Sequence, residues 1–140
     1  ALAGQDEDIE AEQRDYVRAI RAEPDAERKL RIYAAALCRI QPRLAPLFSA
    51  LQAAAPLDRA LRSLWNQIAE RRAANMRLFA EDLASTGRLR PEISTSAAAD
   101  IVWSMNSPEY YILLVERRGW SPVQFEQWLG EAWARLLLIR

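Results

Sequence analysis

The side chains of this chain that could carry out acid–base chemistry are carboxylates, tyrosines, arginines and Lys29. The sequence has no histidine and one cysteine, Cys38, which excludes serine–histidine and cysteine–histidine catalysis. Histidines and closely spaced cysteines are also the usual ligands of transition metals, so no such metal site is expected. No two carboxylates share an otherwise apolar face, where burial would separate their pKa values. The sequence therefore predicts a protein that is not an enzyme and that has no cofactor.

Ligand binding by aromatic side chains with a few polar anchors is the chemistry that remains. Asn75 falls near the centre of the apolar stripe on the segment 56–86, with Arg71 and Arg72 beside it. A polar group on a buried face needs a hydrogen-bond partner, which a ligand pocket can supply. Two alternatives stay open: the helix emerges into solvent at this point, or these side chains only fill the core. The expected ligand-site residues are Tyr33, Leu37, Trp65, Ile68, Arg72, Asn75, Met76, Phe79, Trp103, Asn106, Tyr110 and Tyr111.

Length and composition predict a single all-α domain. The 140 residues are 51% hydrophobic, which is enough for one core. No segment alternates apolar and polar residues with the period of a β-strand, and only four residues are glycine. The 19 basic and 19 acidic residues balance, so no net field attracts nucleic acid or an anionic membrane. Residues 1–12 are acidic and predict a tail or connector, which leaves 13–140 as the folded domain.

Helix start and stop signals divide residues 13–140 into about seven helices in a multi-helix bundle. Pro42 is expected to break or kink the chain, because a proline inside a helix removes a hydrogen bond. The longest helix carries one apolar stripe, formed by Leu57, Leu61, Leu64, Ile68, Phe79 and Leu83. The expected helices span about 13–22, 25–41, 42–54, 56–86, 94–106, 107–118 and 121–138.

The stretch GWSPV predicts a fixed corner before the last helix. Gly119 suits the left-handed residue that ends one helix, and Ser121 suits the N-cap of the next, with Pro122 in its first turn. Trp120 and Phe125 then stand at the two positions of a hydrophobic staple, which fixes the direction of the new helix. The sequence thus predicts that the last helix is presented in one orientation.

The last helix is apolar on more than one side. One stripe consists of Phe125, Leu129, Ala132 and Leu136. Other apolar residues lie outside that stripe, namely Trp128, Trp133, Leu137 and Leu138. One core cannot cover both sets, so a second copy of the chain is expected on one of them, and which face is core stays open. The expected dimer-interface residues are Ile101, Val102, Met105, Phe125, Trp128, Leu129, Ala132, Trp133, Leu136 and Leu137.

The segment DIVWSMNSPEYYILLVERRGWSPVQFEQWLGEAWARLL, residues 100–137, resembles the C-terminal region of TetR-type (TetR/AcrR) transcriptional regulators. The resemblance consists of an Asp-apolar-apolar-Trp pattern, S-P-E-x-Y, an L-L-V run, R-G-W-S-P and a following W-L pair. Residues 13–95 are similar only in a looser way. The matching residues are Asp100, Trp103, Ser107, Pro108, Glu109, Tyr110, Leu113 to Val115, Arg118 to Pro122, Trp128 and Leu129.

The resemblance implies an effector-binding and dimerisation domain. It implies a homodimer in which the helices at about 94–106 and 121–138 of both copies form a four-helix bundle. It also implies a helix-turn-helix head before this domain, yet no three-helix unit fits before residue 24. DNA recognition, with repression as the expected outcome, is therefore attributed to an N-terminal domain that this chain does not contain. The expected partners are a second copy and a small apolar or aromatic effector.

Two other functions remain as alternatives. A helical dimerisation or protein-interaction module would share the dimer surface, but the centre of its long helix would be packed solid. An enzyme on a helical scaffold would need a pair of inward-facing acids, and none is found. A lone Cys38 and the lack of a signal peptide or long apolar run favour a cytoplasmic protein without membrane contact, although a buried cysteine suits any compartment.

Overall fold

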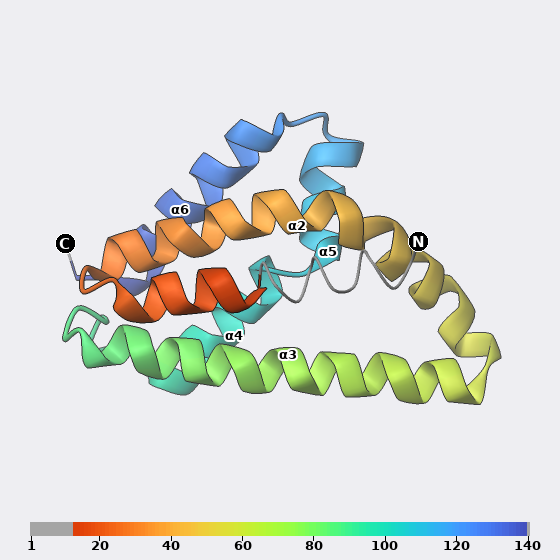
Figure 1. Cartoon of the computed structure of the whole chain (residues 1–140), viewed down its shortest axis with the longest axis horizontal. Helices are drawn as coiled ribbons and strands as arrows, with labels where there is room; N and C mark the ends of the chain where they lie inside the picture. The colour runs from red at the N-terminus through yellow and green to blue at the C-terminus, as the bar shows by residue number, and fades with distance from the viewer. Residues whose placement is uncertain (1–12, 140) are drawn as a thin grey trace.

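The computed structural model describes residues 13–139, and these are helices joined by short connections (Figure 1). Within this range the extended pairing is one isolated antiparallel bridge between Leu89 and Leu138. The predicted all-α class is confirmed, while the predicted tail at 1–12 lies outside the described residues. Residues 13–22 are helical, and the elements that follow are α2 (Ala26–Ala54), a 3-10 turn η1 (Ala55–Leu57), α3 (Arg59–Ser85), α4 (Thr95–Met105), α5 (Pro108–Tyr111), its π-helical continuation η2 (Ile112–Arg117) and α6 (Pro122–Leu137).

Of the two outcomes predicted at Pro42, a break or a kink of the chain, the break does not occur. Helix α2 runs without interruption for 29 residues and contains both Pro42 and Pro46. Its second half turns toward the start of α3, so the helix bends instead of ending (Figure 1). Two expected helices are thereby one, and the described residues contain six helices instead of seven, with η2 counted as part of α5.

Side-chain caps set most of the helix starts, as the sequence predicts. Ser94 Oγ accepts from the Ala97 amide at 3.0 Å, and Ser107 Oγ accepts from the Tyr110 amide at 3.2 Å. Helix α3 begins later than predicted, because Asp58 accepts from the amides of the first turn while the 3-10 turn occupies the residues around Pro56. Local hydrogen bonding therefore determines where the elements begin.

The corner before α6 has the predicted backbone. Gly119 has a φ of +74°, and Ser121 Oγ accepts from the Gln124 amide at 3.1 Å. The ring contacts differ from the predicted staple: Trp120 lies edge-on to Trp128 with centroids 6.3 Å apart, whereas Phe125 lies edge-on to Tyr111. The direction of α6 is thus supported by two separate aromatic pairs.

The sequence leaves open which apolar face of α6 is core, and the structure buries parts of both. It packs against α2, and the row Phe125, Leu129, Trp133 and Leu137 points into the core. Trp133 and Leu137 are completely buried, whereas Leu136 is 47% exposed. The buried row has a spacing of four residues, which is one face of a helix. At the end of α6, backbone hydrogen bonds join residues 88–90 to Leu137 and Ile139, so this segment lies beside Leu137 and Leu138.

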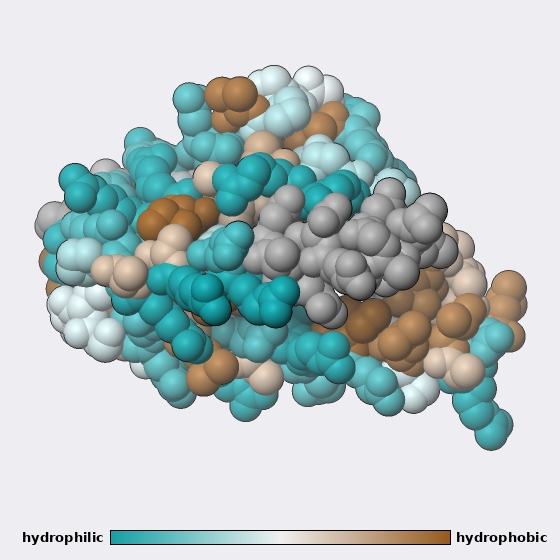
Figure 2. Space-filling view, in the orientation of Figure 1, coloured by the Kyte–Doolittle hydropathy of each residue, from teal (hydrophilic) through white to brown (hydrophobic). Residues whose placement is uncertain are grey.

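The apolar stripe of α3 is buried only in its second half. Phe79 and Leu83 belong to the core, but Leu57 is 89% exposed and Leu64 and Ile68 are also exposed. Hydrophobic atoms accordingly gather on the surface near the end where α2 passes into α3 (Figure 2). Helix α4 and the helix 13–22 cover the second half of α3, while its first half faces the bent part of α2 across a cavity.

None of the helices in residues 13–139 has the length and apolar content needed to cross a membrane.

Replacing Gly119 and Gly130 by alanine should change the stability in opposite directions. Gly119→Ala places a side chain at positive φ, so it should lower the free energy of unfolding by about 1 kcal/mol. Gly130 lies inside α6, where alanine is the better helix former by about 1 kcal/mol. The new Cβ would meet only the mobile end of Arg31 at 2.9 Å, so this variant should be equally or more stable. Urea unfolding measures both, and a Gly119→Ala variant as stable as the wild type contradicts the prediction.

Candidate ligand-binding site

A cavity of about 340 Å³ lies between α2, the first half and middle of α3, and the junction of α4 and α5. Its volume is at the lower end of the range for small-molecule pockets, about 300 to 1,000 Å³. The sequence analysis named twelve ligand-site residues, and eight of them line this cavity: Tyr33, Leu37, Trp65, Ile68, Arg72, Asn75, Met76 and Asn106.

The remaining four predicted residues lie elsewhere. Phe79 lines a neighbouring cavity. The ring of Trp103 lies under the Arg72 guanidinium, outside the cavity. The hydroxyl of Tyr110 accepts from Trp128 Nε1 at 2.8 Å, and Tyr111 packs edge-on against Phe125. The aromatic residues around the α5 start therefore support α6 and do not line the site.

The sequence analysis missed one wall of the cavity, which is the second half of α2. This wall could have been found, because residues 37, 41, 44, 48 and 51 are spaced by four and three, which is one face of a helix. Because the helix was expected to end at Pro42, the residues before and after it were not recognised as one face. Lining residues not predicted from the sequence are Gln13, Tyr16, Ile40, Gln41, Leu44, Leu47, Phe48, Leu51, Ala69 and Pro108.

Asn75 was expected on a buried face, and the structure corrects this. Its side chain is exposed at the boundary between two cavities, both of which it lines. The buried amide is Asn106, the residue that ends α4. A rotation of 100° per residue does place Asn75 in line with the apolar stripe. However, α3 is not covered along its whole length, so a position on that stripe does not by itself bury a side chain.

Asn106 is the centre of a buried hydrogen-bond network. Its Nδ2 donates to the hydroxyl of Tyr33 at 2.8 Å, and its Oδ1 accepts from Arg72 Nη2 at 2.5 Å. Its backbone oxygen accepts from Gln41 Nε2 at 2.8 Å. Burial raises the pKa of Tyr33 far above its ordinary value, so this hydroxyl stays neutral and its own hydrogen faces Met76 Sδ. The network fixes the polar end of the cavity.

Two groups at this polar end keep unused bonding capacity. Gln41 is 2% exposed, yet its Oε1 has no hydrogen-bond partner. An unpaired buried acceptor costs about 1 to 3 kcal/mol. Arg72 donates to Asn106 and to the backbone oxygen of Trp103 at 3.1 Å, but no carboxylate in residues 13–139 forms an ion pair with it. Both groups are suited to a polar atom of a bound molecule.

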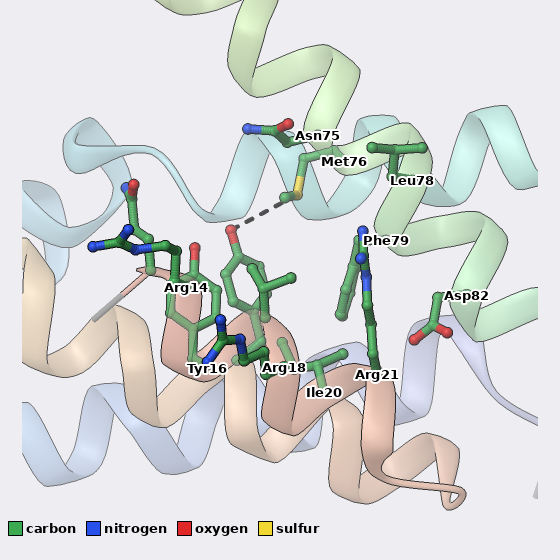
Figure 3. Close-up of a pocket in the computed structure, with 13 residues that line it drawn as sticks. Arg14, Tyr16, Arg18, Ile20, Arg21, Asn75, Met76, Leu78, Phe79 and Asp82 are labelled. Carbon is green, nitrogen blue, oxygen red and sulfur yellow. Dashed lines mark hydrogen bonds between the residues drawn. The ribbon is translucent and has the colours of Figure 1, made fainter. Parts of the chain in front are cut away.

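A second, more open cavity of about 560 Å³ lies between the helix 13–22 and α3 (Figure 3). Arg14, Arg18 and Arg21 project from the helix 13–22, opposite the α3 residues that line the same cavity (Figure 3). Ile20 and Asp82 also line it, and both bind Lys29, whose Nζ donates to Asp82 at 2.8 Å and to the Ile20 carbonyl at 2.7 Å. The two cavities share walls, so the helix 13–22 borders both.

The described part of the chain offers no group of three or more His, Cys, Asp or Glu side chains that could hold a metal ion. Comparisons with protein-family models, with curated proteins and with solved structures each give no match.

The Asn106 network predicts unequal effects of two Asn→Ala substitutions. Asn106→Ala removes the hydrogen bonds that its side chain makes with Tyr33 and Arg72 and should lower the free energy of unfolding by about 2 kcal/mol. Asn75→Ala, at an exposed position, should change it by less than about 0.5 kcal/mol. Urea denaturation compares the two, and equal effects would show that the Asn106 network contributes nothing.

Proposed function

We propose that this chain is the ligand-sensing and homodimerisation domain of a TetR-type transcriptional regulator, most simply a repressor. A small, largely apolar effector binds in the cavity beside Asn106. Its binding would control DNA recognition by a helix-turn-helix domain that lies outside residues 13–139.

The cavity is the single observation that carries the proposal. A hollow of about 340 Å³ that is partly open to solvent is large enough for a small molecule, and without one it holds water. Its walls include Leu44, Phe48, Trp65 and Ile68, which suit an apolar or aromatic body. An interaction module without a ligand would be packed solid at this place. The cavity beside the middle of α3 therefore favours ligand sensing over that alternative.

The position of Asn106 suggests how an effector would act on the dimer. Asn106 ends α4, and α4 contacts α6, the two helices that the proposed dimer uses. A ligand that touches the Asn106 network therefore reaches the end of an interface helix. It would shift the arrangement of the two copies only by the difference in its affinity for the two states.

The proposed dimer surface is smaller than the sequence suggested. Of the ten residues expected there, six are buried within the chain itself and cannot contact a partner: Val102, Phe125, Leu129, Ala132, Trp133 and Leu137. Trp128, at 41%, and Leu136 are exposed, and Ile101 and Met105 are half-buried. We propose that these four side chains form the apolar part of an interface of about 1,000 Å² or more.

Filling the cavity should abolish ligand binding without unfolding the protein. Ala69 lines the cavity, so the ring of Ala69→Phe occupies it. The affinity for the apolar fluorescent probe N-phenylnaphthylamine should fall at least about tenfold, or ~1.4 kcal/mol. The matched control is Ala74→Phe on the same helix, at an exposed position that lines neither cavity.

Fluorescence titration and urea unfolding of both variants give the answer. Equal probe affinity for Ala69→Phe and Ala74→Phe would remove the cavity as the binding site. A wild-type chain that dimerises but binds no probe would favour the interaction module instead.

The proposed interface predicts that a charge introduced at Leu136 of α6 weakens dimerisation. Leu136→Glu places a carboxylate in the proposed interface and should raise the dimer dissociation constant at least about tenfold. Leu57→Glu, at the exposed turn before α3, is the control and should leave the constant unchanged. Sedimentation velocity measures both. A wild-type chain that is monomeric at tens of micromolar, or a dimer unaffected by Leu136→Glu, contradicts the proposed interface.

A further inference from the structure

The polar end of the cavity carries one positive charge and no negative charge. Arg72 is the only charged residue among the described side chains that line it. The recorded partners of its guanidinium are neutral: the Trp103 ring and carbonyl, and Asn106 Oδ1. Glu109 acts on Arg72 electrostatically but does not line the cavity, so a cation there would meet the guanidinium without a carboxylate beside it and would be repelled. The cavity therefore selects against cationic ligands.

Gln41 adds a requirement for a hydrogen-bond donor. Its amide orientation is fixed, because the Asn106 carbonyl that it contacts can only accept and so must face the nitrogen. The atom left without a partner is then the oxygen, Oε1. Oε1 is closed to solvent, so the side chains around it must move apart before a donor on a ligand can reach it. A ligand that does so satisfies a buried acceptor that the protein leaves unpaired.

The two requirements apply to the same place. Gln41 bonds the backbone oxygen of Asn106, and Arg72 bonds its side-chain oxygen. A polar group seated beside Asn106 therefore meets an acceptor and a donor. A hydroxyl is the smallest group that fits both, since its O–H donates to Gln41 Oε1 while its oxygen accepts from Arg72.

The apolar end indicates the size of the ligand. Phe48 and Trp65 form a ring pair with centroids 4.8 Å apart. Phe48 lies seven residues beyond Gln41 on α2, a rise of roughly 10 Å at 1.5 Å per residue. A body of about two aromatic rings spans this distance and can pack against both side chains.

We propose that the effector is a hydroxylated aromatic molecule of about two rings, with its hydroxyl between Gln41 Oε1 and Arg72 and its rings directed toward Phe48 and Trp65. This inference rests on the proposed function, because it assigns a ligand class to the same cavity.

Calorimetric titration of the full chain at neutral pH tests the class with three probes of matched body. These are naphthol, naphthalene and naphthylmethylamine, which carry a hydroxyl, no polar group and an ammonium group. Naphthol should bind at least about tenfold more tightly than naphthalene, equivalent to one additional satisfied hydrogen bond. The ammonium probe should bind at least about tenfold more weakly than naphthol because of Arg72.

A pair of variants assigns the preference to Gln41. In Gln41→Met the ratio of naphthalene to naphthol dissociation constants should fall to within about threefold of unity, since the acceptor is gone. Leu44→Met changes the same wall without removing a polar group, so it should keep the wild-type ratio. The ratio is taken within each variant, which cancels changes in cavity shape. If Gln41→Met does not fold, Arg72→Gln tests the other contact: it removes the positive charge, so the ammonium probe should bind within about threefold of naphthol.

The outcomes separate this inference from the proposed function. Equal binding of naphthol and naphthalene would show that a bound hydroxyl does not reach Gln41 Oε1, and it would overturn the hydroxyl assignment while leaving the cavity as a ligand site. Tightest binding of the ammonium probe would likewise overturn it, as would a wild-type ratio in Gln41→Met. If N-phenylnaphthylamine and all three probes fail to bind, both the ligand class and the proposed function are wrong.

Discussion

The packing of one side chain, Tyr33, links almost every element of this fold. Its ring stacks on Trp133 of α6 with centroids 5.5 Å apart and on Tyr16 of the helix 13–22 at 5.6 Å, and it contacts Phe79 of α3 at 5.1 Å. Its hydroxyl accepts from Asn106 at the end of α4. A tyrosine combines a large apolar body with a polar tip, so its ring completes the core while its hydroxyl lies at the cavity. The core and the candidate site therefore share this residue.

This arrangement gives the cavity two unlike ends. Toward the bend of α2 it has apolar walls, and beside Tyr33 it has a small set of polar groups in fixed positions. Most of those groups satisfy one another through Asn106, which gives the network a single geometry. Gln41 and Arg72 are the exceptions, because each keeps capacity for a partner from outside the chain. Unsatisfied buried groups lower stability, and proteins retain them mainly where a ligand or solvent completes them.

The candidate site was partly predictable, and the errors have one origin. Tyr33, Leu37, Trp65 and Ile68 follow from helical periodicity, since aromatic and apolar residues at such spacing lie on one side of a helix, and here that side lines the cavity. Phe48 and its neighbours on α2 were missed because a proline was expected to end the helix. A proline removes one hydrogen bond, a loss that a long helix can bear by bending when both of its halves are packed. The prolines do disturb the helix, which bends, but they do not end it.

The sequence alone determines the all-α class, the N-caps at Ser94, Ser107 and Ser121, and the left-handed turn at Gly119. Each of these depends on interactions within a few residues along the chain. Tertiary structure alone decided the continuity of α2, the burial of Trp133 in place of Leu136, and the choice of Asn106 over Asn75 as the buried amide. Periodicity gives the directions of side chains around a helix but not which neighbour covers which side. That depends on contacts between residues far apart in the sequence, which no local pattern encodes.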